Sequence, residues 1–140
     1  MSEQLLKAII LLFAILAKVD GVSDDEKETI KSFLLNRLNE KTALGYYDLF
    51  NSLIEVYKQQ SGRMSPEEKR INEKQEVEKI CRQINAELTH HQKIVLSLDL
   101  IMLTIADGTI SAKEEALLNQ IAKEIKVDRQ DIDSIKLFSL

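Results

Sequence analysis

The sequence predicts an all-α fold, and three observations carry that prediction. Only four Gly and one Pro occur in 140 residues, whereas a sandwich or barrel of short strands needs turn residues at roughly every 8–12 positions. Aromatic residues make up 5% of the chain and Trp is absent, while residues that favour helices, such as Leu, Lys, Glu and Ala, are abundant. Signals for helix starts also recur along the chain. We therefore expect residues 1–140 to form a single helical domain.

The expected helix starts are marked by capping boxes. In this motif a Ser or Thr side chain accepts a hydrogen bond from the third helical amide, and a Glu or Gln there reaches back to the capping residue. The pattern begins at Ser23, Ser65, Thr89 and Ser111, and Pro66 falls at a first helical position, where its missing N–H costs nothing. Apolar residues follow helical spacing between these starts. Seven helices are expected, at about 3–19, 24–38, 43–59, 66–87, 90–106, 112–126 and 129–138.

Two of these helices differ from the others in composition. Helices 3–19 and 90–106 are apolar nearly all the way round, which is typical of a buried helix in a globular protein. The remaining helices are amphipathic. We expect the two apolar helices to form a central pair, wrapped by five amphipathic helices.

Charge and composition limit the compartment and the partners. Nineteen Lys and Arg against 23 Asp and Glu give a net charge of −4, so nucleic acid, which selects basic surfaces, is not an expected partner. Residues 8–17 have the length of a signal-peptide core, but Glu3 and the single cation Lys7 precede them, and so short a run does not cross a bilayer. Cys81 is the one cysteine, which favours a reducing compartment. We expect a cytoplasmic protein that meets membranes only indirectly.

The two apolar helices also indicate an internal duplication. Each runs into an Asp-Gly pair, Asp20-Gly21 or Asp107-Gly108, followed by Ser-x-x-Glu and an amphipathic helix. The first copy has one residue fewer between Gly and Glu. Because the N-terminal apolar helix has an internal counterpart, we expect it to be a core helix rather than a signal peptide.

The acidic residues of the two Asp-Gly turns have two interpretations. The first is structural: Gly ends one helix, Asp bonds to local amides, and Ser and Glu cap the next helix. The second is an acidic surface that holds a divalent cation or a basic partner, with the two turns pooling their carboxylates. The candidate cation ligands are Asp20, Glu26, Asp107 and Glu114, and the candidate partner-binding residues are Asp24 and Asp25.

A relationship to calcium-binding EF-hands is the alternative interpretation of the second turn. Residues 107–114 match the last eight positions of an EF-hand loop, with Asp, Gly and Glu at the fifth, sixth and twelfth positions. The first and third positions would be Leu103 and Ile105, whose side chains do not bind calcium. The alternative function is therefore a calcium-responsive, EF-hand-related helical protein.

The succession of apolar helix, Asp-Gly turn, Ser-x-x-Glu and capped helix resembles the TerB-like family. This family includes the tellurite-resistance protein TerB and the N-terminal region of a membrane-anchored J-domain co-chaperone. The most similar stretch is Ile105–Ile125, which contains Ala106-Asp107-Gly108, Ile110-Ser111 and Glu114. The expected number of helices and the duplication extend the resemblance over nearly the whole chain.

The resemblance implies a function without catalysis. It implies an intracellular, non-enzymatic module of stress responses, tellurite resistance among them, that binds a protein partner or is fused to another domain. It also implies a metal-binding or interaction role for the acidic turns, at Asp20 and Glu26 and at Asp107 and Glu114.

The remaining polar candidates favour structural roles. His90 and His91 are adjacent at a helix start, so their side chains diverge and are expected to be exposed. Asp99 interrupts helix 90–106 and is expected to bond to a Lys or Arg of a neighbouring helix; an enzyme that uses this carboxylate is the weakest alternative. The charged stretch 67–79 predicts a solvated helix or a partner-binding arm, and the apolar ending at Leu140 predicts the N-terminal module of a longer polypeptide.

Overall fold

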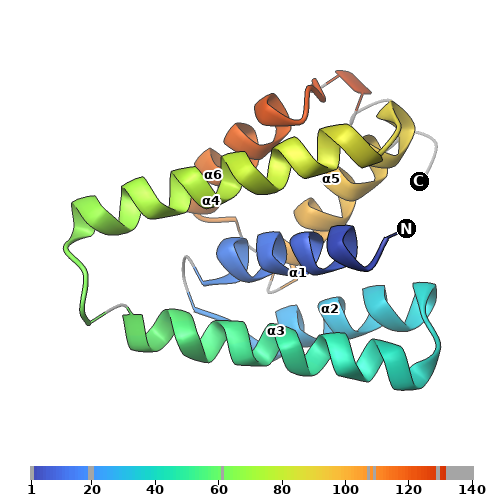
Figure 1. The fold of residues 1–140 in the computed structure, drawn as a ribbon, viewed down its shortest axis with the longest axis horizontal. Helices are drawn as coiled ribbons and strands as arrows, with labels where there is room; N and C mark the ends of the chain where they lie inside the picture. The colour runs from blue at the N-terminus through green and yellow to red at the C-terminus, as the bar shows by residue number, and fades with distance from the viewer. Residues whose placement is uncertain are drawn as a thin grey trace.

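The structure of the protein is a computed structural model that describes residues 2–18, 21–60, 62–106, 108, 110–128 and 130–131. This part of the chain contains no strand, and the all-α prediction is confirmed (Figure 1). The expected helix 129–138 lies outside the described residues except for residues 130 and 131. Within the described residues the helices are α1 (Glu3–Ala17), α2 (Asp24–Arg37), α3 (Glu40–Gln60), α4 (Pro66–Glu87), α5 (His90–Thr104) and α6 (Ala112–Glu124).

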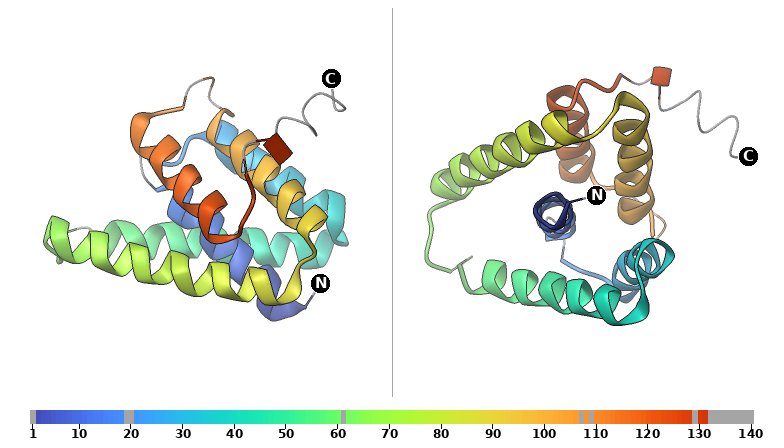
Figure 2. Two further views of the ribbon diagram at one scale, coloured as in Figure 1. Left: turned by 90° about the horizontal axis from the view of Figure 1, so that it is seen from above. Right: turned by 45° about the vertical axis from the view of Figure 1, so that its right-hand side comes forward.

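Helix α1 lies at the centre of the molecule. Figure 2 shows it end-on, with the other helices arranged around it, and it contacts α3, α4, α5 and α6. Between its first and last buried residues, every side chain except Lys7 and Leu11 is buried. The ring of Phe13 meets that of Phe33 of α2 edge-on, with 4.9 Å between centroids. The prediction that this apolar segment is a core helix is confirmed.

Helix α5 is buried on one side only. It packs against α1, α2 and α6 through a face that includes Leu96, Leu100 and Leu103. On its other side Met102 is 59% exposed, and Ile105, which follows the helix, is 45% exposed. The expectation of a central apolar pair is therefore confirmed for α1 alone. Although α5 is apolar nearly all the way round, one of its faces stays exposed, because no described element covers that face.

The helix starts agree closely with the capping signals. The side chains of Ser23, Thr89 and Ser111 form complete capping boxes. Ser65 caps α4 by accepting a hydrogen bond from the amide of Glu68 at 3.1 Å, and Pro66 occupies the first turn as expected. Each of these four starts lies where the sequence predicts it.

Among the helix boundaries that differ from the predicted ones, two have identifiable reasons. Helix α3 begins three residues early, because the Asn39 side chain accepts a hydrogen bond from the amide of Thr42 at 2.9 Å and acts as its cap. Helix α6 ends two residues early, because Lys126 adopts a left-handed conformation with φ of 63°. The amide of Val127 then bonds to the carbonyl of Ala122 at 2.9 Å, which closes the helix end.

Helix α4 joins the central helix to α6. Cys81 is buried, and burial, with a smaller effect of the nearby Glu124 carboxylate, raises the pKa of its thiol to about 12, so it is a core residue as predicted. The side-chain amide of Asn85 donates to the carbonyl of Glu124 at 2.9 Å, satisfying an acceptor at the end of α6. Within the described part of the chain, no helix combines the length and the apolar composition needed to cross a bilayer.

Candidate functional site

The two Asp-Gly turns share one backbone geometry. Gly21 has a φ of 84° and Gly108 a φ of 97°, a left-handed conformation that favours glycine. Their amides donate to the carbonyls three residues earlier, at Lys18 (3.4 Å) and Ile105 (2.8 Å). A Cβ at either glycine would meet no atom within 4 Å, so backbone conformation rather than crowding selects Gly. Asp20 and Asp107 lie outside the described residues.

The two glutamates that follow the turns are buried in their caps. Glu26 is 3% exposed and Glu114 is 6% exposed. The carboxylate of Glu26 accepts from the amide of Ser23 at 3.2 Å, and that of Glu114 accepts from the amide of Ser111 at 3.2 Å. In return, each glutamate amide donates to the serine hydroxyl oxygen at 3.1 Å. Both glutamates thus perform the capping function of the structural interpretation.

The exposed carboxylates are not the same in the two turns. Asp24 and Asp25 lie exposed in the first turn of α2, whereas the equivalent positions of α6 are Ala112 and Lys113. The described residues contain no group of three or more His, Cys, Asp or Glu side chains that could hold a metal ion. Carboxylate oxygens suit calcium or magnesium, but a cation site here would need Asp20 or Asp107 as well.

Three exposed apolar residues lie close in the sequence to the second turn. Met102, Ile105 and Ile110 are 59%, 45% and 39% exposed, and they are three of the seven large apolar side chains that the described residues leave exposed. We call these three residues the second-turn patch. The sequence interpretation placed Met102 in the core. The position of Asp99, three residues earlier and therefore on the same helix face, was the available sign that this face is turned outward.

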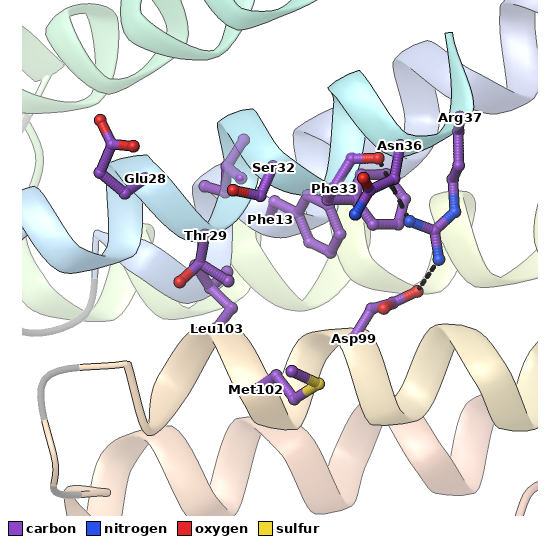
Figure 3. Close-up of a pocket in the computed structure, with 11 residues that line it drawn as sticks. Phe13, Glu28, Thr29, Ser32, Phe33, Asn36, Arg37, Asp99, Met102 and Leu103 are labelled. Carbon is purple, nitrogen blue, oxygen red and sulfur yellow. Dashed lines mark hydrogen bonds and ion pairs between the residues drawn. The ribbon is translucent and has the colours of Figure 1, made fainter. Parts of the chain in front are cut away.

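A groove of about 310 Å³ lies between α2 and α5. Figure 3 shows Arg37 and Asp99 at one end of it, joined at 3.0 Å, so the expected bond from Asp99 to a neighbouring helix is confirmed. The Arg37 guanidinium also stacks on the ring of Phe33 at 3.9 Å. Burial raises the pKa of Asp99, and the charge and hydrogen bond of Arg37 oppose that rise. This arrangement is that of a structural ion pair between two helices.

A larger hollow lies between α3, the first half of α4 and α6. Its volume is about 1080 Å³, and it brings Gly21 and Val22 of the first turn to the same space as Lys113 of α6. Much of its wall comes from the charged stretch 67–79. Tyr57 of α3 crosses the space to α4, where its hydroxyl donates to the Glu76 carboxylate at 3.4 Å. Nothing in the linear sequence pairs these segments, so the sequence did not predict this hollow.

The two histidines lie at the exposed start of α5, as expected. His90 is not isolated, because its Nε2 lies 3.1 Å from a carboxylate oxygen of Asp131. The Asp131 amide in turn donates to the side chain of Asp128 at 3.0 Å, which is the hydrogen bond that an N-cap residue accepts. These contacts tie the last described residues to the start of α5.

Comparison with known proteins identifies the family. A sequence model described as tellurite resistance protein TerB matches residues 6–137 of this chain. Searches of curated proteins and of solved structures gave no match. The family match covers both Asp-Gly turns and nearly the whole chain, in agreement with the resemblance found in Ile105–Ile125. The chain therefore belongs to the TerB family of tellurite-resistance proteins.

Proposed function

We propose that this TerB domain is a cytoplasmic, non-enzymatic module that binds a protein partner in a stress response of the tellurite-resistance type. Family membership supports the type of response. The observation that carries the binding role is the second-turn patch, Met102, Ile105 and Ile110. This patch flanks Asp107-Gly108, the pair that the sequence marks for an interaction role.

The proximity of these three residues along the chain, rather than exposure by itself, favours a partner. Single exposed apolar residues are ordinary on a protein surface, but grouped ones mark contact sites. Interfaces commonly have an apolar centre, in which Met is enriched, within a polar rim. Here Glu115, which is exposed on α6, follows the turn and would supply part of such a rim.

The experiment is growth of the source organism on potassium tellurite, with the chromosomal gene replaced by the variant Met102→Ser/Ile105→Ser/Ile110→Ser. We expect this variant to be as sensitive as a deletion strain while its protein level is unchanged. The matched control is Leu35→Ser/Leu44→Ser/Val56→Ser, which alters three other exposed apolar residues (41%, 37% and 45% exposed). It should grow like the wild type.

Two results would contradict the proposal. If the deletion strain is sensitive to tellurite and the patch variant is fully resistant, the patch has no role in tellurite resistance. A deletion strain as resistant as the wild type would remove the link to tellurite.

A divalent cation at the Asp-Gly turns is the second candidate. The left-handed conformation shared by Gly21 and Gly108 supports it, because the backbone then turns in the same way at both Asp-Gly pairs. The buried capping glutamates fix the start of the helix that follows each pair. Asp24 and Asp25 would add exposed oxygen donors beside the first turn. A ligand that binds only the folded state raises the melting temperature, so calcium or magnesium at millimolar concentration should do so here.

The double variant Asp20→Asn/Asp107→Asn should abolish the rise in melting temperature, whereas Asp48→Asn, on the exposed side of α3, should keep it. If the parent protein shows no rise, the cation proposal fails. Calorimetry separates the EF-hand-related alternative, because EF-hand sensors bind calcium with dissociation constants of about 10⁻⁷–10⁻⁵ M.

A further inference from the structure

The hollow between α3, α4 and α6 carries an excess of positive charge on a protein of net charge −4. The described residues that line it include six cations and two carboxylates, Glu73 and Glu76. We call this space the basic hollow. The six cations are Lys18, Lys58, Lys69, Arg70, Lys79 and Lys113.

Both carboxylates of the basic hollow are engaged by neighbours. Glu73 lies 3.5 Å from the ammonium group of Lys18, and Glu76 accepts from the Tyr57 hydroxyl. Lys18 also lies 4.1 Å from the centre of the Tyr57 ring, so these four side chains form one connected wall. Burial and the nearby glutamate charges raise the pKa of Tyr57, which keeps its hydroxyl protonated as a donor.

Three other cations of the basic hollow have no partner among the described residues, which indicates that they bind a ligand. Arg70, Lys79 and Lys113 are exposed, and none of them forms an ion pair with a described residue. They come from two helices, α4 and α6, that face the same space. Between them the hollow also has apolar lining, in which Ile54 and Leu117 are 5% and 6% exposed. Cationic rim and apolar floor together match an amphipathic ligand with carboxylates on one side.

We propose that the basic hollow binds an acidic, amphipathic segment of a partner protein, with its carboxylates on the rim cations and its apolar side chains on the floor. The volume of about 1080 Å³ lies at the upper end of the roughly 300–1,000 Å³ of small-molecule sites. The lining cations are spread over α3, α4 and α6, so we assign the hollow to a polypeptide segment, which can reach all three helices. A flat bilayer surface does not reach the floor of a concave site. This surface is distinct from the second-turn patch, and its partner segment has the opposite charge from one that would bind the acidic turns.

The test uses the full chain and a fluorescein-labelled 16-residue helical peptide with Leu on one face and Glu on the other. Fluorescence anisotropy measures its affinity at low and moderate salt. A peptide with Gln in place of Glu tests the rim, and one with Ser in place of Leu tests the floor. We expect binding of the Glu/Leu peptide alone, weakened by salt as expected for exposed charge pairs.

The decisive variant is Arg70→Gln/Lys79→Gln/Lys113→Gln, with Lys41→Gln/Lys74→Gln/Lys123→Gln as the control. The control residues are exposed and do not line the hollow, and they produce the same change in net charge. We expect the rim variant to weaken peptide binding about tenfold and the control to change it less than twofold. Melting curves of both variants check that the fold is retained.

Equal weakening by the two variants, or no binding of the Glu/Leu peptide, overturns the proposal. Binding of a 20-nucleotide single strand or of phosphatidylserine vesicles in place of the peptide, if it depends on the same three cations, overturns it as well, because the ligand would then be a nucleic acid or a membrane. Neither outcome bears on the second-turn patch.

Discussion

The two helix–turn–helix units of this domain have the same local geometry and different surroundings. In the first unit α1 leads through Gly21 to α2, and in the second α5 leads through Gly108 to α6. Both glycines are left-handed, and both following helices begin with a complete capping box. Yet α1 is enclosed by other helices while α5 exposes one side (Figure 2). Local sequence signals therefore determined the turn, and the neighbouring helices determined the burial.

Equivalent positions make the difference concrete. Counting back from the Asp-Gly pairs, Ile15 corresponds to Met102 and Leu12 to Asp99. Ile15 and Leu12 are both fully buried, whereas Met102 is 59% exposed and Asp99 pairs with Arg37 at the surface of the groove. The second unit thus has side chains available for contact at positions where the first unit has core.

The largest expected effect comes from truncating the equivalent residues of the two units. Ile15→Ala should lower the free energy of unfolding by about 2–5 kcal/mol, because it removes a buried side chain and leaves a cavity. Met102→Ala should change it by no more than about 0.5 kcal/mol, as an exposed position does. Urea denaturation measures both. Similar losses at the two positions would show that α5 is as buried as α1.

The glycines of the two turns should behave alike. Gly21→Ala and Gly108→Ala should each lower the free energy of unfolding by about 1–2 kcal/mol, because a Cβ disfavours the left-handed backbone. Gly45→Ala, within α3 and also free of any atom within 4 Å, should raise it by about 0.5–1 kcal/mol. Thermal and urea unfolding check the signs. A stabilising effect at either turn would contradict the shared backbone geometry.

The capping serines test the same equivalence at smaller magnitude. Ser23→Ala and Ser111→Ala should each cost about 1 kcal/mol, because each removes the acceptor of a buried glutamate's amide. Ser32→Ala, at an exposed position inside α2, is the control and should stay within about 0.5 kcal/mol of the wild type. Unequal losses of unfolding free energy at Ser23 and Ser111 would show that the two caps do not contribute equally to stability.

The smallest expected effect is a pH dependence of the unfolding free energy that arises from Asp99 in the second unit. Burial raises the pKa of Asp99 above its ordinary value of 3.8, against the opposing effect of Arg37, so the folded protein holds this proton more tightly than the unfolded chain. The stabilisation is complete below the ordinary pKa and is lost as the pH rises through the folded pKa. The wild type should therefore lose stability relative to Asp99→Asn as the pH rises above about 3.8. Urea denaturation across this range measures it, and a relative gain would contradict the sign.

The sequence was most informative where local interactions decide the structure. Helix starts at Ser23, Ser65, Thr89 and Ser111 were predictable because a capping box is contained in four consecutive residues. The end of α6 was not, because Lys126 adopts a left-handed conformation that usually belongs to Gly. The role of α5 was mistaken because composition alone does not say which helices will cover a given face.

The candidate surfaces were less predictable than the fold. The capping roles of Glu26 and Glu114 follow from the motif, and the bond from Asp99 to a basic residue follows from placing one carboxylate in an apolar helix. The basic hollow depends on contacts such as that of Tyr57 with Glu76, which join α3 to α4. Such contacts depend on how the helices cross, and no short motif encodes that crossing. The role of Asp20 and Asp107 as cation ligands stays a prediction.

The central claim is that the second-turn patch contacts a protein partner. The most direct measurement is photo-crosslinking in living cells, with a photoreactive amino acid in place of Ile105 or, as the control, in place of Leu35 on α2. We expect position 105 to give one discrete protein adduct that is lost with Met102→Ser/Ile110→Ser, and position 35 to give none. No adduct at position 105, or the same adducts at both positions, would contradict the claim.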